Sequence, residues 1–499
     1  MCAPTPNTTR WFAAGNERTI VEAGALEGEE SVSGRPVRIV GRFGPLPVVL
    51  AGTFMITLDF FIVNVAIPSI QADLHASSSA VEWVVAGYGL TFAIFLITAG
   101  RLGDRFGRRR MFALGLFLFS VASAACGAAP DSQTLIAARV GQGIAAAMIS
   151  PQVLSIIGVV YQGQSRLRAL SIWGTTMGFA AAGGQLIGGL VTQADVGGLG
   201  WRWCFLINLP VGGLALYLTP RLVPESRAEQ PRRPDLAGML LITVALTAVV
   251  LPLIEGRQQG WPTWTWLSLA ASPFASAAFI FHQRWLTRRG GDPLLDLALF
   301  GERAFSAGLL IQLTFWSGMA SFFLVLAIYL QEGRGLNAME AGSVFTILAV
   351  AYLVAALRAP RLVFRYGRRL VAAAALVVAI GHGVLLAGLS VVGTHGAIAA
   401  LVPGLLLIGT GMGLAIAPLA GTVLANLQPE RAGAASGLLS TMQQVGNALG
   451  VAVIGVIFFG AAPHGLAYAM KLSLLALALL LLVVATLTRL LPGLRKQTG

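Results

Sequence analysis

An acidic residue and a basic residue that lie inside long apolar stretches of this chain, where a charge is costly, are the first candidates for chemistry. Asp59 lies in the stretch that begins at residue 46, and Arg139 lies in the one that begins at residue 133. A carboxylate that is expensive to ionise is a candidate for binding and releasing a proton. If the two stretches are neighbouring helices, Arg139 pairs with Asp59 while Asp59 is ionised. When Asp59 is protonated, Arg139 binds substrate or water instead. A static ion pair that only fixes packing is the alternative.

The composition of the chain excludes a soluble protein. The 499 residues are 56% hydrophobic and only 11% charged, whereas soluble domains carry roughly a quarter charged residues. A disordered chain would need far less apolar content. The three cysteines lie far apart, which excludes a disulfide framework or a zinc motif. The chain therefore belongs in a membrane, with the lipid bilayer as a partner.

Apolar stretches long enough to cross a bilayer, about 20 residues each, recur from residue 46 almost to the end. They predict fourteen spanning helices, and of the 21 acidic residues only Asp59 lies well inside one of them. The predicted spans place successive loops on alternate sides of the membrane. Nearly all Lys and Arg residues of these loops and of the termini fall on one side, and only Arg202, Arg257 and Arg334 fall on the other. Because basic loops face the cytoplasm, both termini are expected there. The net charge of +13 follows from this topology, and no nucleic-acid partner is expected.

An internal sequence repeat divides the predicted spans into two halves. Residues 100–109 read GRLGDRFGRR and residues 360–369 read PRLVFRYGRR, and each segment follows the second span of a six-span block. Parallel six-span repeats are typical of a transporter that opens a central site alternately to each face of the membrane. The predicted parts are a polar cytoplasmic tail without fixed structure, a first half, two inserted spans, a second half and a short cytoplasmic tail, at residues 1–45, 46–220, 221–303, 304–490 and 491–499.

Several segments resemble the motifs of a known family. They are the loop at 100–109, LDFFIVNVAIP at 58–68, WRWCFLINLPVG at 201–212, and AGAASG at 432–437 followed by QQVG at 443–446. Over residues 46–490 the chain resembles the fourteen-span drug:proton antiporters of the major facilitator superfamily. The resemblance implies the all-helical major facilitator fold, a gating role for the first loop, and a link of Arg139 and Gln142 to proton coupling.

The loop after the second predicted span carries one carboxylate, Asp104, among several arginines. A single carboxylate can tie two helix ends together in one conformation and release them in another. The simpler alternative is a basic anchor at the cytoplasmic surface. The repeat has Phe364 in place of Asp104, so any such latch is asymmetric. The candidate gating residues are Gly100, Gly103, Asp104, Arg105, Gly107 and Arg108.

The predicted fifth span, residues 169–192, is rich in glycine, which lets a neighbouring helix approach closely. The family's antiporter motif reads here GQLIGG at 184–189, with Gln185 in place of the usual proline. This departure weakens the inference of export from that motif alone. Gln185 bonds either into the cavity or to a neighbouring helix. The candidate packing residues are Gly174, Gly178, Gly184, Gly188 and Gly189.

Polar and aromatic residues at helical spacing supply candidates for a substrate cavity. Such side chains suit flat or cationic lipophilic molecules. Packing between helices is the alternative for each of them. The candidates are Tyr88, Phe92, Gln185, Gln312, Trp316, Gln443, Gln444 and Asn447.

The sequence contains no nucleotide-binding loop, nucleophile motif or metal-ligand constellation, so no cofactor, metal or enzymatic reaction is expected. We expect a multi-pass protein of the inner (plasma) membrane that works as a monomer. It would export lipophilic or cationic small molecules in exchange for protons by alternating access. The alternatives are a dedicated exporter of one endogenous metabolite and a membrane sensor or scaffold that does not transport.

Overall fold

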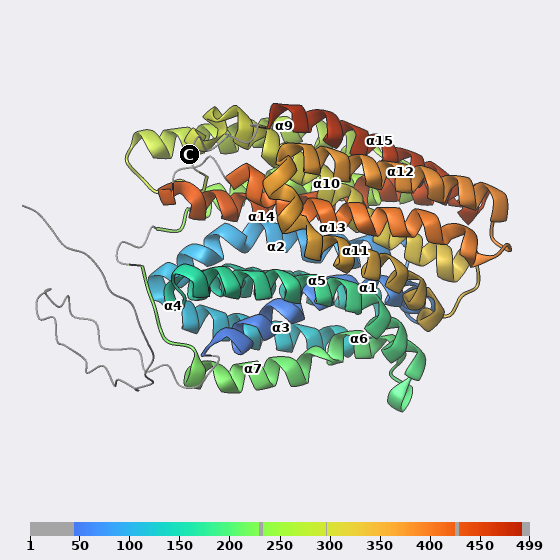
Figure 1. Cartoon of the computed structure of the whole chain (residues 1–499), viewed down its shortest axis with the longest axis horizontal. Coiled ribbons are helices and arrows are strands. Elements are labelled where there is room, and N and C mark those ends of the chain that lie inside the picture. Colours follow the sequence, from blue (N-terminus) through green and yellow to red (C-terminus); the bar gives the residue numbers. More distant parts are fainter. Residues whose placement is uncertain (1–43, 229–232, 296, 425–428, 492–499) are drawn as a thin grey trace, which may run out of the picture. The chain divides into compact units, whose positions relative to one another are not determined.

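The computed structural model describes residues 44–228, 233–295, 297–424 and 429–491, and all regular structure in these ranges is helical (Figure 1). The predicted tails lie almost entirely outside the described residues. Within these described ranges, thirteen helical segments are long and apolar enough to cross a membrane. The predicted fifth span is covered by α5 (Gly163–Ala194). The all-helical membrane class expected from the sequence is therefore confirmed.

The helices follow one another with short connections. Before the inserted pair come α1 (Leu46–Leu74), α2 (Ser78–Phe106), α3 (Arg108–Gly127), α4 (Ser132–Val160), α5, α6 (Trp203–Leu206) and α7 (Asn208–Leu222). The inserted pair is α8 (Leu236–Gln258) and α9 (Thr263–Arg288). After it come α10 (Arg303–Ile328), α11 (Ala338–Tyr366), α12 (Arg368–Val392), α13 (Val402–Leu424), α14 (Pro429–Ala461) and α15 (Leu466–Leu487).

The repeat seen in the sequence has a counterpart in the backbone. Gly107 ends α2 and begins α3 with φ +112°, and Gly367 ends α11 and begins α12 with φ +51°. Residues with a side chain rarely adopt such angles, so glycine is required at both breaks. Both basic segments therefore break the chain between consecutive helices at a glycine with positive φ, although the two glycines differ in φ and ψ.

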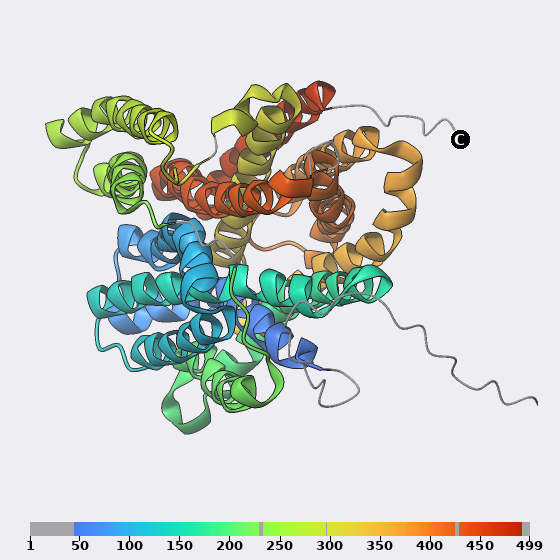
Figure 2. The ribbon, with the colours of Figure 1, turned by 90° about the vertical axis from the view of Figure 1, so that its left-hand side faces the viewer.

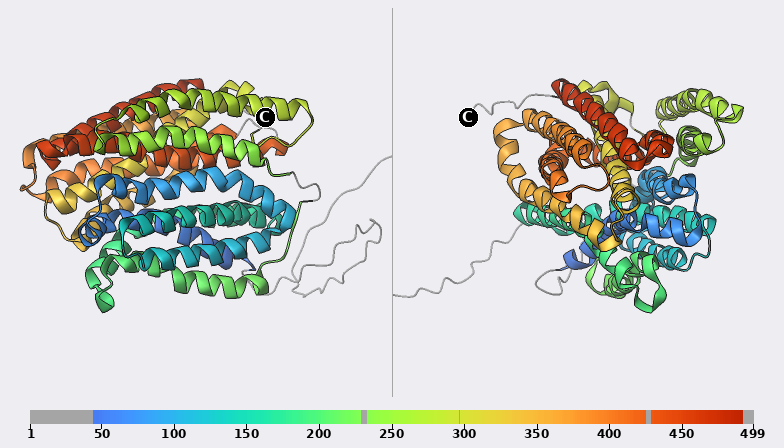
Figure 3. Two further views of the ribbon diagram at one scale, coloured as in Figure 1. Left: turned by 180° about the vertical axis from the view of Figure 1, so that it is seen from behind. Right: turned by 90° about the vertical axis from the view of Figure 1, so that its right-hand side faces the viewer.

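The helices form two groups with the inserted pair beside them (Figure 2). Between the groups, α2 packs on α14 and α5 packs on α11. The inserted helices α8 and α9 pack on each other, and α8 also contacts α2 and α14. Figure 3 shows the same pair from behind. The inserted pair thus touches one helix of each group.

Basic loops from distant parts of the sequence meet at one end of the helices, which we call the basic end. Arg101 Nη1 donates to the backbone oxygens of Arg233 and Asp292, each at 2.9 Å. The backbone N–H of Arg109 donates to Glu225 Oε1 at 3.1 Å. The loops that follow α2, α7 and α9 therefore lie together, as expected if they share one side of the membrane.

Candidate functional site

A buried polar network surrounds Asp59 on α1. Its side chain has no exposed surface, and neither has that of Arg139 on α4. Arg139 Nη1 donates to Asp59 Oδ2 at 2.5 Å. Asp59 Oδ1 accepts from Gln142 Nε2 and from Asn208 Nδ2, each at 2.8 Å. The network therefore joins α1, α4 and α7 around one carboxylate.

Helix α4 presents two of these residues on one face. Arg139 and Gln142 are three positions apart, which places their side chains next to each other on a helix. Arg139 Nη1 donates to Gln142 Oε1 at 2.7 Å, and Arg139 Nε donates to the backbone oxygen of Val84 on α2 at 2.9 Å. The start of α4 is fixed by Asp131, whose Oδ1 accepts from the N–H of Thr134 at 2.8 Å.

Two members of the network were not among the predicted site residues. Ser123 on α3 accepts from Gln142 Nε2 at 3.1 Å and from Asn208 Nδ2 at 2.9 Å, and it donates to the backbone oxygen of Phe205 at 2.8 Å. Asn208 lies within the segment 201–212 that carries the family resemblance. That segment was the available signal for Asn208, whereas nothing in the sequence marked Ser123.

The negative charge of Asp59 balances the positive charge of Arg139 only while Asp59 is ionised. Its carboxylate accepts three hydrogen bonds from side chains, and the guanidinium of Arg139 stays charged under all physiological conditions. Arg139 Nη2 is buried without a partner among the described residues. Removing one charge of a buried pair leaves the other uncompensated, which costs about 3–5 kcal/mol. Protonation of Asp59 therefore favours a rearrangement that gives Arg139 another partner.

The aromatic candidates on α2 pack against this network. The ring of Tyr88 lies 4.4 Å from Arg139 Cζ and 5.9 Å from the ring of Phe92. The hydroxyl of Tyr88 donates to the backbone oxygen of Ile56 at 3.3 Å. Tyr88 is fully buried and covers one face of the guanidinium, so this residue belongs to the surroundings of the ion pair.

Several amide candidates are buried with unused hydrogen-bonding atoms. Neither amide atom of Gln185 has a partner among the described residues, and the same holds for Oε1 of Gln312 and Oδ1 of Asn447. Asn447 Nδ2 donates to Oε1 of the half-buried Gln444 at 3.0 Å. Unpaired buried amides are uncommon in folded proteins. These residues of α5, α10 and α14 therefore have free capacity for a ligand or water.

The remaining cavity candidates lie on the same helices. Trp316 is 6% exposed on α10 and packs edge-on against Phe315. Gln443 is half-buried on α14. A Cβ at Gly89 on α2 would lie 3.6 Å from the backbone oxygen of Gln444. The structure thus brings Gln444 and Asn447 of α14 against α2, at the residue next to Tyr88.

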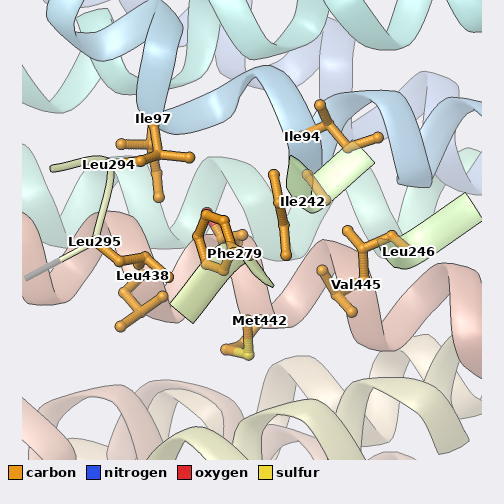
Figure 4. Close-up of a pocket in the computed structure, with 12 residues that line it drawn as sticks. Ile94, Ile97, Ile242, Leu246, Phe279, Leu294, Leu295, Leu438, Met442 and Val445 are labelled. Carbon is orange, nitrogen blue, oxygen red and sulfur yellow. The ribbon is translucent and has the colours of Figure 1, made fainter. Parts of the chain in front are cut away.

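A separate apolar pocket lies between α2, α14 and the inserted pair (Figure 4). None of the predicted cavity residues lines it. Its lining includes Ile94, Ile97, Ile242, Leu246, Phe279, Leu294, Leu295, Leu438, Met442 and Val445. The pocket is therefore distinct from the polar network.

Asp104 in the predicted gating loop joins two consecutive helices. Its Oδ1 accepts from Arg108 Nη2 at 2.8 Å, and the two residues lie on either side of the break at Gly107. Arg105 is exposed, with its guanidinium 5.5 Å from the ring of Phe106. The side chain of the corresponding Phe364 lies outside the described part of the chain.

Glu225, in the segment after α7, places a second carboxylate beside this loop, and it was not among the predicted site residues. Its Oε2 lies 3.7 Å from Nε of both Arg109 and Arg110. A Cβ at Gly107 would be 2.7 Å from the carboxylate, and a Cβ at Gly103 would collide with the side chain of Gln152. A Cβ at Gly100, in contrast, would make ordinary contact with α4.

The glycines of α5 differ in what they approach. A Cβ at Gly188 would be 2.8 Å from the backbone oxygen of Ile62, and Gly184 is similarly close to α1. Gly446 and Gly450 of α14 likewise lie against the backbone of α10. These contacts let α1 and α5, and likewise α10 and α14, pack with their backbones close together.

Other α5 glycines face α11 or open space. A Cβ at Gly189 would collide with the backbone of Ala338, and one at Gly178 would be 3.0 Å from the ring of Tyr352. A Cβ at Gly174 would meet no described atom within 4 Å. Close helix packing therefore involves four of the five predicted glycines.

Glu82 on α2 corrects the expectation that Asp59 is the single well-buried acid. Its side chain has 0% exposed surface. Helix α2 begins at Ser78, and Glu82 near its start lies against Arg257 of α8 and Gly455 of α14. A residue at the end of an apolar stretch is buried here because helices from other parts of the sequence cover it.

Comparisons with known proteins agree with this architecture. The model of the Major Facilitator Superfamily matches residues 49–451. The "Probable actinorhodin transporter" of Streptomyces coelicolor is 36% identical over 436 residues, which cover 87% of this chain and 75% of that protein. The puromycin resistance protein pur8 of Streptomyces alboniger is 36% identical over 451 residues, which cover 87% of this chain and 88% of that protein.

A solved structure supports the fold. The D-xylose-proton symporter matches with a TM-score of 0.63 over 90% of this chain and 97% of its own, at 16% identity. At this identity the likeness concerns the fold alone.

Proposed function

Because the chain belongs to the major facilitator superfamily, we propose that it exports lipophilic or cationic small molecules in exchange for protons. The chain is a transporter without enzymatic activity and a multi-pass protein of the bacterial plasma membrane. Relatives named for antibiotic transport and resistance support the efflux class. We further propose that the protein works as a monomer.

The observation that carries the proton coupling is the burial of Asp59 against Arg139. The pair is held by Gln142 and Asn208 inside the helices and has no exposed surface. A proton that binds Asp59 removes the partner of Arg139, so the energies of the two cavity orientations change unequally. A cationic substrate would compete with the proton for the same negative charge.

The proposed orientation places the basic end in the cytoplasm, together with both termini. Under this orientation substrate enters from the basic end or the inner leaflet and leaves at the opposite end. The loop at Asp104 and Glu225 would then lie at the entrance and help to hold one conformation.

The proposed substrate surface combines aromatic and amide side chains. Tyr88 and Phe92 supply rings, and Gln185, Gln312 and Asn447 supply unpaired amide atoms. Such a surface suits a flat lipophilic molecule that carries a few polar groups. A dedicated exporter of one metabolite is the second candidate, which the name of the actinorhodin relative favours.

The function is tested by accumulation of a fluorescent lipophilic cation in inside-out vesicles. We expect uptake that depends on an acidic interior and disappears with a protonophore, and that is absent from vesicles without the protein. Competition by many unrelated compounds would support a multidrug exporter, whereas competition by one compound class would support the dedicated exporter. Uptake that survives the protonophore would contradict proton coupling.

A further inference from the structure

Glu82 forms a second buried ion pair that is separate from the Asp59 network. Its Oε1 lies 3.4 Å from Arg257 Nη2 on the inserted helix α8. Its Oε2 is buried without a partner among the described residues, and so is Arg257 Nε. The pair is therefore less completely hydrogen-bonded than the one between Asp59 and Arg139.

Glu82 lies where three parts of the fold meet. It belongs to α2 of the first group, Arg257 belongs to the inserted pair, and Gly455 belongs to α14 of the second group. A Cβ at Gly455 would collide with the carboxylate, so glycine lets Glu82 lie directly against α14. All three residues lie toward the end of the helices opposite the basic end.

The charges that act on Glu82 both come from α8. They are those of Arg257 and Glu255. Arg257 Nη2 also donates to Ser78 Oγ at 3.0 Å, and Glu255 Oε1 accepts from Trp83 Nε1 at 2.9 Å. From α14, Gly455 lies against the carboxylate and the ring of Phe459 lies 5.1 Å from Arg257 Cζ, and neither residue carries a charge.

A second arginine, Arg139 on α4, also contacts α2, because its Nε donates to the backbone oxygen of Val84. Arg139 is paired with Asp59 and not with Glu82. The site of Glu82 thus contains two carboxylates and one guanidinium. One of its carboxylates is buried with an unused oxygen.

Opening at this end would change the surroundings of Glu82. The packing of α2 on α14 joins the two groups, so their separation here would remove Gly455 from the carboxylate and admit water. Water stabilises an ionised carboxylate. Protonation of Glu82 therefore favours the closed arrangement over the open one.

We propose that Glu82 is a second proton-linked residue of the transport cycle and that the inserted helix α8 positions it by supplying Arg257 as its counter-charge. Proton binding at Glu82 would then favour closure of α2 against α14 at the end opposite the basic loops. This inference rests on the proposed proton-coupled export, and it gives the inserted helices a part in that cycle.

The test measures the separation of the two groups directly. Spin labels at His75→Cys and His464→Cys report the distance between exposed positions beside α2 and α14. The labels are placed in protein whose Cys2, Cys126 and Cys204 are replaced by Ser. The protein also carries Asp59→Asn, which removes the other proton-linked group, and it is held in phospholipid nanodiscs without substrate.

As the pH falls from about 8 to about 5.5, we expect the population with a short distance between the two labels to rise relative to the population with a long distance, by up to about tenfold. With Glu82→Gln we expect short distances at both pH values. With Glu255→Gln, the same change on the neighbouring α8 carboxylate, the response to pH should remain. A Glu82→Gln protein that responds like its parent, or a parent that does not respond, would overturn the proposal.

A second variant, Arg257→Gln, tests the proposal if Glu82→Gln does not fold. Arg257→Gln retains the titrating carboxylate but removes its counter-charge, so the pH at the midpoint of the distance change should rise. A merely structural contact would leave that midpoint in place, and an unchanged midpoint would overturn the proposal.

The result is also separable from the proposed function. The distance measurement needs no substrate or proton gradient, so absence of proton-driven uptake would contradict the exporter without removing the pH response. Proton-driven uptake together with an unresponsive distance would contradict only the role of Glu82.

Discussion

Arg139 Nη1 lies 2.5 Å from Asp59 Oδ2, and neither side chain has any exposed surface. The two residues come from α1 and α4 and are 80 positions apart in the sequence. A buried pair of this kind is weak evidence for stability, because desolvation offsets the attraction between the charges. In the proposed transport cycle, protonation of Asp59 removes the counter-charge of Arg139.

Replacing Arg139 should damage both the fold and transport. In Arg139→Gln the carboxylate of Asp59 loses its counter-charge, and we expect a loss of about 3–5 kcal/mol of stability. The double variant with Asp59→Asn should recover most of that stability but no proton-driven uptake. Thermal unfolding in detergent and vesicle uptake measure the two effects. Equal stability of the single and double variants would contradict a coupled pair.

Asn208 should tune the pH dependence of transport. Asn208→Ala removes one donor to Asp59 Oδ1, and hydrogen bonds to charged groups contribute about 1.5–3 kcal/mol. The ionised form of Asp59 is then less stabilised, so the midpoint of the uptake–pH profile should move to higher pH. Arg202→Ala, which alters an ion pair with Asp73 at the end of α1, serves as the control and should leave the midpoint unchanged.

Two glycines of α5 allow a matched comparison of packing. Gly188→Ala would place a Cβ 2.8 Å from the backbone oxygen of Ile62, whereas Gly174→Ala would meet no described atom within 4 Å. In a helix, Ala is favoured over Gly by about 1 kcal/mol. We expect Gly174→Ala to be neutral or stabilising and Gly188→Ala to lower the unfolding temperature and uptake. Similar effects of both changes would contradict the close approach of α1 and α5.

Asp235, just before α8, should make the inserted pair sensitive to acid. Burial raises the pKa of Asp235, but hydrogen bonds from His282, Gln283 and the N–H of Gly238 outweigh it and leave this pKa below its ordinary value. The stabilisation is therefore present above the ordinary pKa, about 4, and is lost as the pH falls through the lowered value.

Asp235→Ala should cost about 1–2 kcal/mol near neutral pH, because α8 loses its cap. The difference in unfolding temperature between this variant and the parent should shrink below about pH 4. A difference that stays constant down to about pH 3 would show that the charge of Asp235 contributes nothing.

The sequence was sufficient to predict the membrane class and the pairing of Asp59 with Arg139, whereas thirteen of the fourteen predicted spans have a qualifying helical segment among the described residues. A charge inside an apolar stretch is rare enough to mark a site, and Gln142 was predicted only because the family resemblance links it, with Arg139, to proton coupling. Ser123 and Glu82 could not be found in this way. Ser123 is a common residue type in a membrane helix, and the burial of Glu82 depends on α8 and α14, which lie far away in the sequence.

We propose that Asp59 exchanges the transported proton. In inside-out vesicles with an acid interior, addition of a transported lipophilic cation should release protons from vesicles that contain the native protein. Asp59→Asn should abolish that release at equal expression. Asp73→Asn, the same change at the exposed end of α1, should preserve it. Proton release from Asp59→Asn at the native rate would contradict proton exchange at Asp59, because the coupling carboxylate would then lie elsewhere.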